Sequence, residues 1–256
     1  MQFAAREPAL EPAGALRRYY QTLFRHLGAQ EWWPARTRLE VILGAILAQH
    51  TAWRNAALAI KQLRRAGLLK LRELEKASRA EVESCIRPAG FFRQKAAAIR
   101  NFLDWLRRAH NGSLNSMLAG HPEEVRGELL KVKGLGEETA DAILLYAGRQ
   151  PFFVADAYTR RILERHALVP SRASYLEVQD FIHRYLPRDH ALFNEFHALL
   201  VEVGKRYCRR QAPRCEACPL REFLPREAGS EVSDIACLTS RRELRKPRAE
   251  SRAALV

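Results

Sequence analysis

The sequence predicts an all-α protein, because its apolar residues recur at helical spacing and no segment alternates convincingly as a half-buried strand would. Breaks at Gly67, at Arg87-Pro88 and at Asn111-Gly112-Ser113 divide this pattern into separate helices. With 256 residues, 47% of them hydrophobic, the chain is long enough for one large domain or two closely packed smaller ones.

The expected helices follow from the pattern in chain order. Residues 39–65 form one or two helices, and further helices are expected at 80–86, 93–109, 123–131, 137–147, 156–166, 174–185 and 191–207. After residue 228 the chain becomes polar and rich in arginine, which predicts a disordered tail with weak affinity for phosphate.

Charge and cysteine content narrow the function. The net charge of +14 suggests a polyanionic partner, most commonly nucleic acid, although an arginine-rich solvated surface has the same composition. The N-terminal residues include acids and prolines unlike a signal peptide, and the apolar run 41–48 is too short to span a bilayer. We therefore expect a cytoplasmic protein without a membrane partner, whose five cysteines are thiols or metal ligands.

The segment KVKGLGEETADAILLYAG, residues 131–148, has two glycines one residue apart between predicted helices, which is typical of a helix-hairpin-helix. The second helix begins after Gly136, so its first N–H groups and its dipole form an anion site. We expect Gly134, Leu135 and Gly136 to bind a DNA phosphate through the backbone, with Lys133 beside them. An ordinary αα-turn with a glycine cap is the alternative.

Asp156 lies between the apolar run FFVA and an amphipathic helix. A helix N-cap explains an aspartate at this position, since aspartate is among the best capping residues. Downstream of a DNA-binding hairpin, the same carboxylate is also placed to face bound DNA.

Together these motifs resemble the helix-hairpin-helix, Gly/Pro-Asp superfamily of DNA base-excision glycosylases, of which endonuclease III is the best-known member. VKGLGEETADAILLYA followed by FVADAYTRRI carries the resemblance, and LEVILGAILAQHTAW and IRPAGFFRQKA match two further family motifs. The match spans residues 30–220, and its form Q-[HN]-T-x-[WF] with RPxGF is most similar to the 3-methyladenine DNA glycosylase III branch.

The resemblance implies a fold of two helical lobes with double-stranded DNA in the cleft between them. A six-helix barrel that contains the hairpin would span 37–148. Residues 15–36 and 149–225 would form the second lobe with its cysteine loop, and 226–256 would form the tail. The family also implies a monomer that acts on damaged bases.

The resemblance assigns roles to several residues. Asp156 matches the catalytic aspartate, which stabilises positive charge on the sugar and orients or deprotonates water after the base has left the stack. Gln49 matches the residue that fills the gap left in the duplex, although a polar helix cap is the alternative. Trp53 and Trp33, or Trp32 in place of Trp33, would hold a cationic alkylated purine. Packing between the lobes explains the same tryptophans.

The sequence also predicts where four residues after Gly90 lie. Phe91 and Phe92 are expected in the core. Arg93 and Lys95 lie near a helix start, where they either touch phosphate or face solvent.

The hairpin departs from the family at one position. Bifunctional members carry a lysine two residues after the second hairpin glycine, where it forms a Schiff base with the sugar and leads to strand cleavage. Here that position is Glu138, which supplies no amine nucleophile. We therefore expect a monofunctional glycosylase without AP-lyase activity. An enzyme for oxidised pyrimidines and a non-catalytic DNA-binding relic are the alternatives, and the retained Asp156 argues against the relic.

The cysteine motif departs as well. Cys208, Cys215 and Cys218 match the first three positions of the family motif C-x6-C-x2-C-x5-C, but Leu224 occupies the fourth. A [4Fe–4S] cluster normally takes four thiolates. Cys237 can reach back as the fourth ligand, three thiolates can hold the cluster, or the site has lost its metal. A zinc site is also open.

Overall fold

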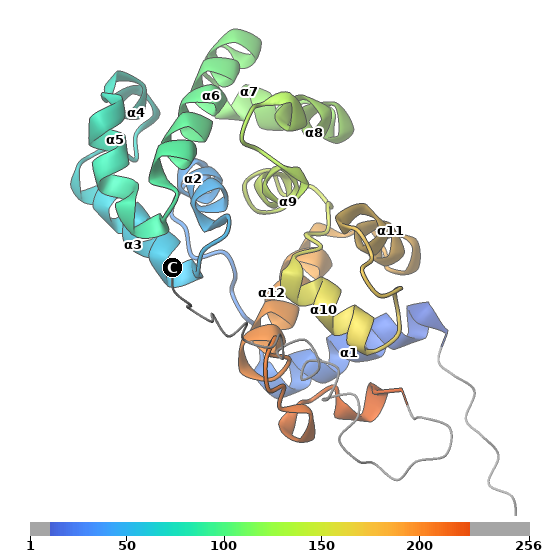
Figure 1. Ribbon diagram of the computed structural model, residues 1–256. Helices are drawn as coiled ribbons and strands as arrows, with labels where there is room; N and C mark the ends of the chain where they lie inside the picture. The colour runs from blue at the N-terminus through green and yellow to red at the C-terminus, as the bar shows by residue number, and fades with distance from the viewer. Residues whose placement is uncertain (1–10, 226–256) are drawn as a thin grey trace, which may run out of the picture.

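The computed structural model describes residues 11–225, and regular structure in that range consists of helices only (Figure 1). The all-α prediction is therefore confirmed. No helix in the described range combines the length and apolarity needed to cross a membrane. The expected tail at 226–256, including Cys237, lies outside the described residues.

The elements, in chain order, are α1 (Pro12–Leu27), α2 (Arg38–Ala48), α3 (Trp53–Arg65), α4 (Leu71–Lys76), α5 (Arg79–Ile86), the 3-10 turn η1 (Arg87–Ala89), α6 (Phe92–His110), α7 (Leu114–Ala119), α8 (Pro122–Lys131), α9 (Glu137–Ala142), the π-helical turn η2 (Ile143–Ala147), α10 (Ala157–Arg165), α11 (Tyr175–Tyr185), α12 (His190–Arg206), and the 3-10 turns η3 (Cys215–Ala217) and η4 (Arg221–Phe223). Three helices, α1, α4 and α7, were not predicted from the apolar pattern.

We call the helices from α2 to η2 the first lobe, and α2 lies at their centre (Figure 1). It contacts α3, α6, α9 and η2, and residues 39–47 are all buried. A helix that is apolar all round belongs in the interior. Its one buried acid, Glu40, accepts from Arg64 of α3 at 2.6 Å and from the backbone N–H of Arg36 at 2.6 Å.

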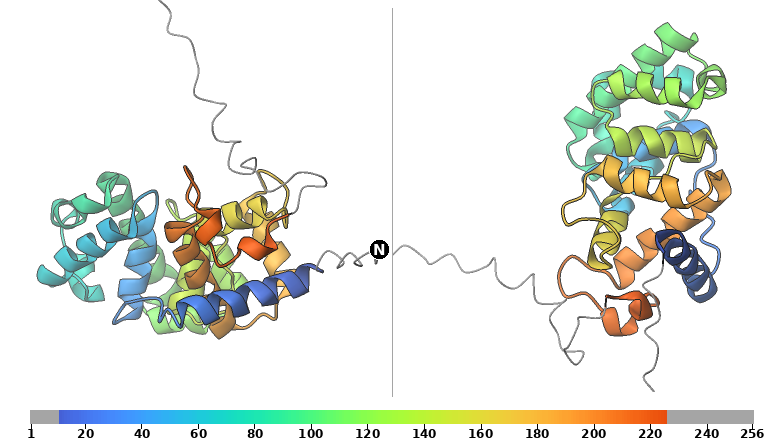
Figure 2. Two further views of the ribbon diagram at one scale, coloured as in Figure 1. Left: turned by 90° about the horizontal axis from the view of Figure 1, so that it is seen from below. Right: turned by 90° about the vertical axis from the view of Figure 1, so that its right-hand side faces the viewer.

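We call α1 together with α10, α11 and α12 the second lobe, which brings together the start and the later helices of the described chain. Helix α1 packs against α11 and α12, and α10 packs against α12 (Figures 1 and 2). The contact between α10 and α12 is close at Gly204, where an added Cβ would stand 2.3 Å from the ring of Tyr158. Only a residue without a side chain allows this approach.

A buried polar network fixes the two lobes to each other. Asp141 of α9 is fully buried and accepts hydrogen bonds from Arg126 (2.6 and 3.0 Å), Tyr175 (2.7 Å) and Gln179 (2.7 Å). Because these donors satisfy the carboxylate, its burial is tolerated. Gln179 of α11 also donates to the Phe153 carbonyl at 2.7 Å. The network therefore anchors the buried segment that leads to Asp156.

Candidate active site

The two hairpin glycines differ in backbone conformation and in packing. Gly134 has a φ of +100°, and an added Cβ would lie 2.7 Å from the Cβ of Ala98 on α6. Both the conformation and the packing therefore require glycine there. Gly136 is extended, and an added Cβ would meet nothing within 4 Å. Open space thus lies directly before the first turn of α9, where another molecule can approach the backbone.

The other predicted hairpin residues divide between core and surface. Leu135 is buried and its N–H donates to the Val132 carbonyl at 3.0 Å. This residue therefore shapes the turn and presents no donor to solvent. Lys133 is exposed, and its carbonyl accepts from Asn101 at 2.8 Å. The binding of DNA phosphate at this turn stays a prediction.

Gln49 ties the end of α2 to the hairpin. Its side-chain amide donates to the Gly134 carbonyl at 3.1 Å and to the Thr139 hydroxyl at 2.9 Å. The residue is half-buried and occupies the C-cap position of α2. In the protein without DNA, Gln49 therefore connects the end of α2 with the hairpin. Its insertion into a DNA duplex stays a prediction.

Asp156 is the N-cap of α10. Its Oδ1 accepts from the backbone N–H of Thr159 at 2.7 Å, while Oδ2 lies 3.6 Å from Nε2 of His197 on α12. The residue is only 8% exposed. Capping therefore engages one carboxylate oxygen, and the other oxygen faces the interior between α10 and α12.

The pKa of the Asp156 carboxyl is lowered from its ordinary value. Burial alone would raise this pKa, but the contact with His197 and the hydrogen bond from Thr159 outweigh burial. Asp156 is consequently an ionised carboxylate at neutral pH, held in a largely dry site.

Glu138, in the first turn of α9, is exposed at the surface, but neighbouring protein and Asp156 still act on its carboxyl group. Its pKa is raised, first because the surrounding protein desolvates its carboxyl and then because Asp156 is nearby. His197, Arg160 and His50 oppose this rise. Two carboxyl groups with opposite shifts in pKa therefore share one site, an arrangement that commonly marks a functional centre.

Two further residues of the site were missed from the sequence. The hydroxyl of Tyr146, in η2, is hydrogen-bonded to Nδ1 of His197, which in turn approaches Asp156. These residues are 51 positions apart in the chain. His197 occurs in the apolar pattern of α12, where a histidine gives no local signal of its partners.

An aromatic cluster lies against this site, formed by Trp32, Trp33, Trp53 and Tyr146. The rings of Trp33 and Trp53 are 4.7 Å apart at 86°, Trp32 and Trp53 are 5.1 Å apart, and Trp33 and Tyr146 are 5.0 Å apart. The structure thus brings the predicted tryptophans together. However, Trp33 and Trp53 touch edge to face, a favoured arrangement for aromatic rings, and do not form parallel facing planes.

The position of Trp33 depends on helix α2. An added Cβ on Gly44 would lie 2.9 Å from the Trp33 ring, so the indole rests directly on the helix backbone. Trp33 and Trp53 are both half-buried and keep part of their surface open to solvent. The cluster can therefore stack on another aromatic ring without exposing the core.

Two expectations for the turn after Gly90 were wrong. Phe91 is 63% exposed rather than in the core, and it is the N-cap of α6 with a φ of +45°. Lys95 is buried, and its ammonium group donates to the carbonyls of Leu47 (2.9 Å) and Ala89 (2.7 Å). It therefore ties this turn to the end of α2 and faces neither phosphate nor solvent.

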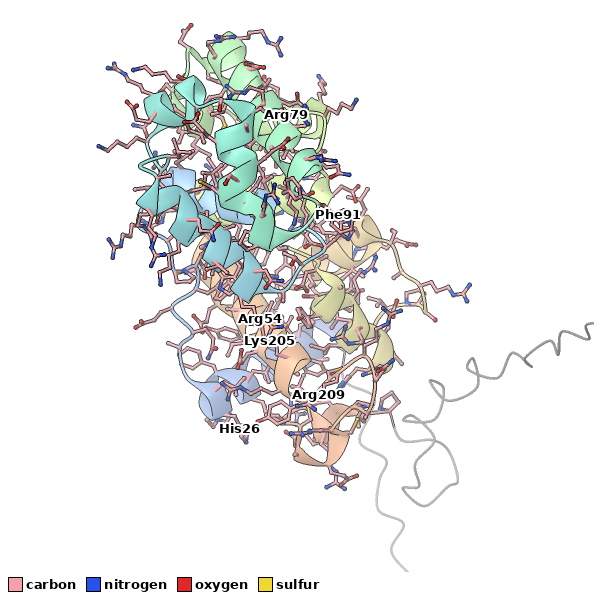
Figure 3. The ribbon with its side chains drawn as sticks, turned by 60° about the vertical axis from the view of Figure 1, so that its left-hand side comes forward. His26, Arg54, Arg79, Phe91, Lys205 and Arg209 are labelled. Atoms are coloured by element: carbon pink, nitrogen blue, oxygen red, sulfur yellow. The ribbon has the colours of Figure 1, made fainter. Side chains whose placement is uncertain are left out.

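Exposed basic side chains share one side of the molecule with Phe91. Figure 3 shows Arg54 of α3, Lys205 of α12 and Arg209 on the same side as Phe91, across both lobes. The ammonium group of Lys205 lies 5.4 Å from the ring centre of Trp32. This side of the molecule therefore combines positive charge with aromatic surface, the features that nucleic-acid sites use.

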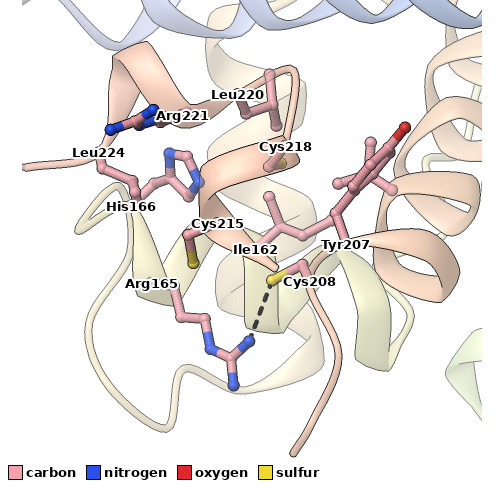
Figure 4. Close-up of a pocket in the computed structure, with 11 residues that line it drawn as sticks. Ile162, Arg165, His166, Tyr207, Cys208, Cys215, Cys218, Leu220, Arg221 and Leu224 are labelled. Carbon is pink, nitrogen blue, oxygen red and sulfur yellow. Dashed lines mark hydrogen bonds between the residues drawn. The ribbon is translucent and has the colours of Figure 1, made fainter. Parts of the chain in front are cut away.

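Three cysteines line one pocket beside α10 (Figure 4). Cys208, Cys215 and Cys218 surround it together with Arg165, His166 and Leu224. Arg165 donates to the Cys208 sulfur at 3.3 Å. The pKa of Cys218 is raised to about 11, first by burial and also by the sulfurs of Cys208 and Cys215, while a backbone hydrogen bond at Leu220 opposes the rise.

Binding of an iron–sulfur cluster or of a metal ion at this pocket stays a prediction. Within residues 11–225, no three His, Cys, Asp or Glu side chains converge closely enough for one metal ion. Three thiols are in place, whereas Leu224 at the fourth family position supplies no ligand.

The sequence is similar to those of known DNA repair proteins. Residues 43–188 match the family model described as HhH-GPD superfamily base excision DNA repair protein. The chain is 39% identical over 206 residues to the Methanocaldococcus jannaschii protein named "Putative DNA repair glycosylase MJ1434", covering 80% of this chain and 93% of that one. It is 30% identical over 195 residues to endonuclease III of Thermotoga maritima, covering 75% and 86%.

Solved structures show the same fold. A non-covalent endonuclease III–DNA complex has a TM-score of 0.72 at 21% identity and covers 84% of this chain and 96% of its own. The H. pylori 3-methyladenine DNA glycosylase bound to 1,N6-ethenoadenine has a TM-score of 0.66 at 24% identity, covering 77% and 98%. The protein therefore belongs to the HhH-GPD superfamily of base-excision DNA repair proteins and is a DNA glycosylase of that family.

Proposed function

We propose that this protein is a monofunctional glycosylase that hydrolyses the N-glycosidic bond of alkylated purines in double-stranded DNA. The observation that carries the proposal is the buried, ionised carboxylate of Asp156 next to an aromatic cluster. Tyr146 connects the two, since its ring packs against Trp33 and its hydroxyl bonds to His197. A base in the cluster would place its sugar near the carboxylate.

The chemistry needs no covalent attachment to the protein. The bond between C1′ of the sugar and the base nitrogen breaks, and its electron pair leaves with the base. Positive charge then develops on the sugar, and Asp156 stabilises it through a short, poorly screened interaction. Water adds to C1′ and gives up a proton to the carboxylate or to solvent. The products are a free base and an abasic site.

The electrostatics of the site favour a cationic base. Alkylated purines carry a positive charge, so they gain from stacking on Trp53 or Trp33 and from attraction to the indole faces. Two carboxyl groups, Glu138 and Asp156, add negative potential at the same place. A neutral oxidised pyrimidine would gain the stacking but not the charge attraction.

The absence of lyase activity is inferred from Glu138. Schiff-base chemistry needs an amine near C1′, and a carboxylate cannot supply one. Lys131 and Lys133 precede the turn, whereas Glu138 follows it. The ammonium group of Lys205 lies 5.4 Å from the ring centre of Trp32, within reach of the aromatic cluster.

We expect purified protein to release 3-methyladenine or 7-methylguanine from methylated duplex DNA and to leave abasic sites. Strand breaks should appear only after alkali. Free bases are measured by mass spectrometry, and breaks by denaturing electrophoresis with and without alkali. Duplexes with an oxidised pyrimidine serve as the matched substrate control.

Three results would contradict this expectation. Breaks without alkali would show that another amine, with Lys205 the first candidate, replaces the missing lysine. Release of oxidised pyrimidines in preference to methylated purines would move the substrate to the endonuclease III class. Binding to damaged duplex without release of any base would leave a DNA-binding relic.

The same proposal includes a DNA-contacting role for Phe91. Lys95 holds the turn at Phe91 against the end of α2, which carries Gln49. An exposed aromatic side chain on a rigid turn can insert between bases and stabilise a distorted duplex. Gly136 and the neighbouring helix start would then bind phosphate through the backbone.

Replacement of Phe91 by alanine should weaken binding to duplex DNA by about tenfold, since stacking on an aromatic side chain contributes about 1–3 kcal/mol per base. Thermal stability should stay the same, because the side chain is 63% exposed. Fluorescence anisotropy with labelled duplex measures the affinity. Leu176→Ala, at a residue 43% exposed on α11, is the matched control. Equal effects of both substitutions would refute the role.

We also propose that Cys208, Cys215 and Cys218 hold a [4Fe–4S] cluster, with Cys237 as the fourth ligand. Three thiols around one pocket and the Arg165 side chain at the Cys208 sulfur support it. When bound, the cluster would stabilise the loop between α12 and η4. No catalytic step is assigned to it.

Protein purified without oxygen should contain about four iron atoms per chain and equal sulfide, with the visible absorption of a cluster. Cys215→Ser should lose both iron and absorption, and Cys237→Ser tests the fourth ligand in the same way. Cys85→Ser, in α5, is the control and should keep them. An unsubstituted protein free of iron and sulfide would refute the assignment.

A further inference from the structure

The polar contacts behind Asp156 form a short array across three elements. Tyr146 of η2 is hydrogen-bonded to Nδ1 of His197 on α12, and Nε2 of His197 lies 3.6 Å from Oδ2 of Asp156. His197 and Asp156 are 6% and 8% exposed. Within the described chain, Nε2 of His197 has no hydrogen-bond partner of ordinary length. A buried donor of this kind calls for a functional explanation.

The chemistry of the three groups fixes the direction of the array. An ionised carboxylate only accepts hydrogen bonds, so the Nε2 that faces Asp156 carries a proton. In the neutral imidazole, Nδ1 is then an acceptor, and the Tyr146 hydroxyl donates to it. The pKa of Tyr146 is raised well above its ordinary value, first by burial and then by Asp156, which keeps this hydroxyl a donor.

We propose that His197, oriented by Tyr146, is a positioning residue that holds Oδ2 of Asp156 in its working orientation during base excision. The proposal rests on the glycosylase function proposed above. The distance of 3.6 Å exceeds that of a normal hydrogen bond, but such contacts often shorten only when the substrate is bound. His197 does not touch the reacting atoms and acts through Asp156.

The array also connects the carboxylate to the base site. The ring of Tyr146 lies 5.0 Å from that of Trp33, while its hydroxyl bonds to His197. Packing of a base on Trp33 would therefore constrain Tyr146, then His197, and finally the Asp156 carboxylate. One continuous set of contacts would place the base and orient the carboxylate together.

Other ionisable groups surround the array and belong in any account of its pH dependence. Glu138 approaches from α9, Arg160 from α10 and Glu195 from α12, and His50 lies beyond the end of α2. Glu138 and Glu195 disfavour further negative charge, whereas Arg160 favours it. These groups remain in place when His197 or Tyr146 is replaced.

The test compares His197→Ala, His197→Gln and Tyr146→Phe for single-turnover base release over a range of pH. His197→Ala should slow release by about tenfold to a hundredfold, the usual range for losing a hydrogen bond to a charged group. His197→Gln keeps a side-chain N–H donor and should recover part of the rate. Tyr146→Phe keeps the ring against Trp33 and should lose less than His197→Ala.

The pH profile separates positioning from simple structural support. His197 helps to lower the pKa of Asp156, so removing it leaves burial less opposed and raises that pKa. Because the ionised carboxylate is the active form, the acid limb of the rate profile should move to higher pH in His197→Ala. Affinity for damaged duplex should stay the same. His110→Gln, which alters a histidine paired with Glu128 in the first lobe, should leave the profile unchanged.

Unchanged rates and acid limbs in all three variants of an active, folded enzyme would overturn the proposal. If His197→Ala fails to fold, His197→Gln and Tyr146→Phe still decide it, since an unchanged rate and acid limb in both would refute it. If the proposed glycosylase function itself is wrong, the unsubstituted protein will release no base. That result differs from failure of the positioning role, in which the unsubstituted protein is active.

Discussion

Burial of one ionised carboxylate is the constraint on which the rest of the site depends. A charge in the protein interior is stable only when polar contacts offset its lost hydration. Asp156 accepts a hydrogen bond from the backbone N–H of Thr159 in α10, and its other carboxylate oxygen lies 3.6 Å from Nε2 of His197 on α12. Helices α10 and α12 must therefore lie close together, and Gly204 makes that approach possible.

Helix α10 joins two sites that are separate in the sequence. Its first residue follows Asp156, while Arg161 and Arg165 farther along hold the cysteine loop through the Cys208 carbonyl (2.8 Å) and the Arg209 carbonyl (2.7 Å). His166, just beyond, bonds to Tyr19 of α1 at 2.6 Å. Order in the cysteine loop thus supports the helix that positions the carboxylate, and the proposed cluster would add to that order when bound.

Local patterns in the sequence predicted the hairpin turn and the helix cap of the site. The spacing of Gly134 and Gly136 identified the hairpin, and Asp156 before an amphipathic helix identified a cap, because both depend on a few adjacent residues. His197 and Tyr146 gave no such signal, since their roles arise from contacts between distant helices. Phe91 and Lys95 were misplaced for a related reason. Their positions depend on how the turn at Gly90 and the start of α6 pack against the end of α2, which adjacent residues do not show.

The central claim is that Asp156 performs the chemistry while other groups bind DNA, and Asp156→Asn tests it most directly. Asparagine keeps the size of the side chain and a capping oxygen but removes the charge. Single-turnover base release should fall by about a hundredfold or more, with affinity for damaged duplex unchanged. Release at the unsubstituted rate would contradict the account, because the buried charge would then have no part in breaking the glycosidic bond.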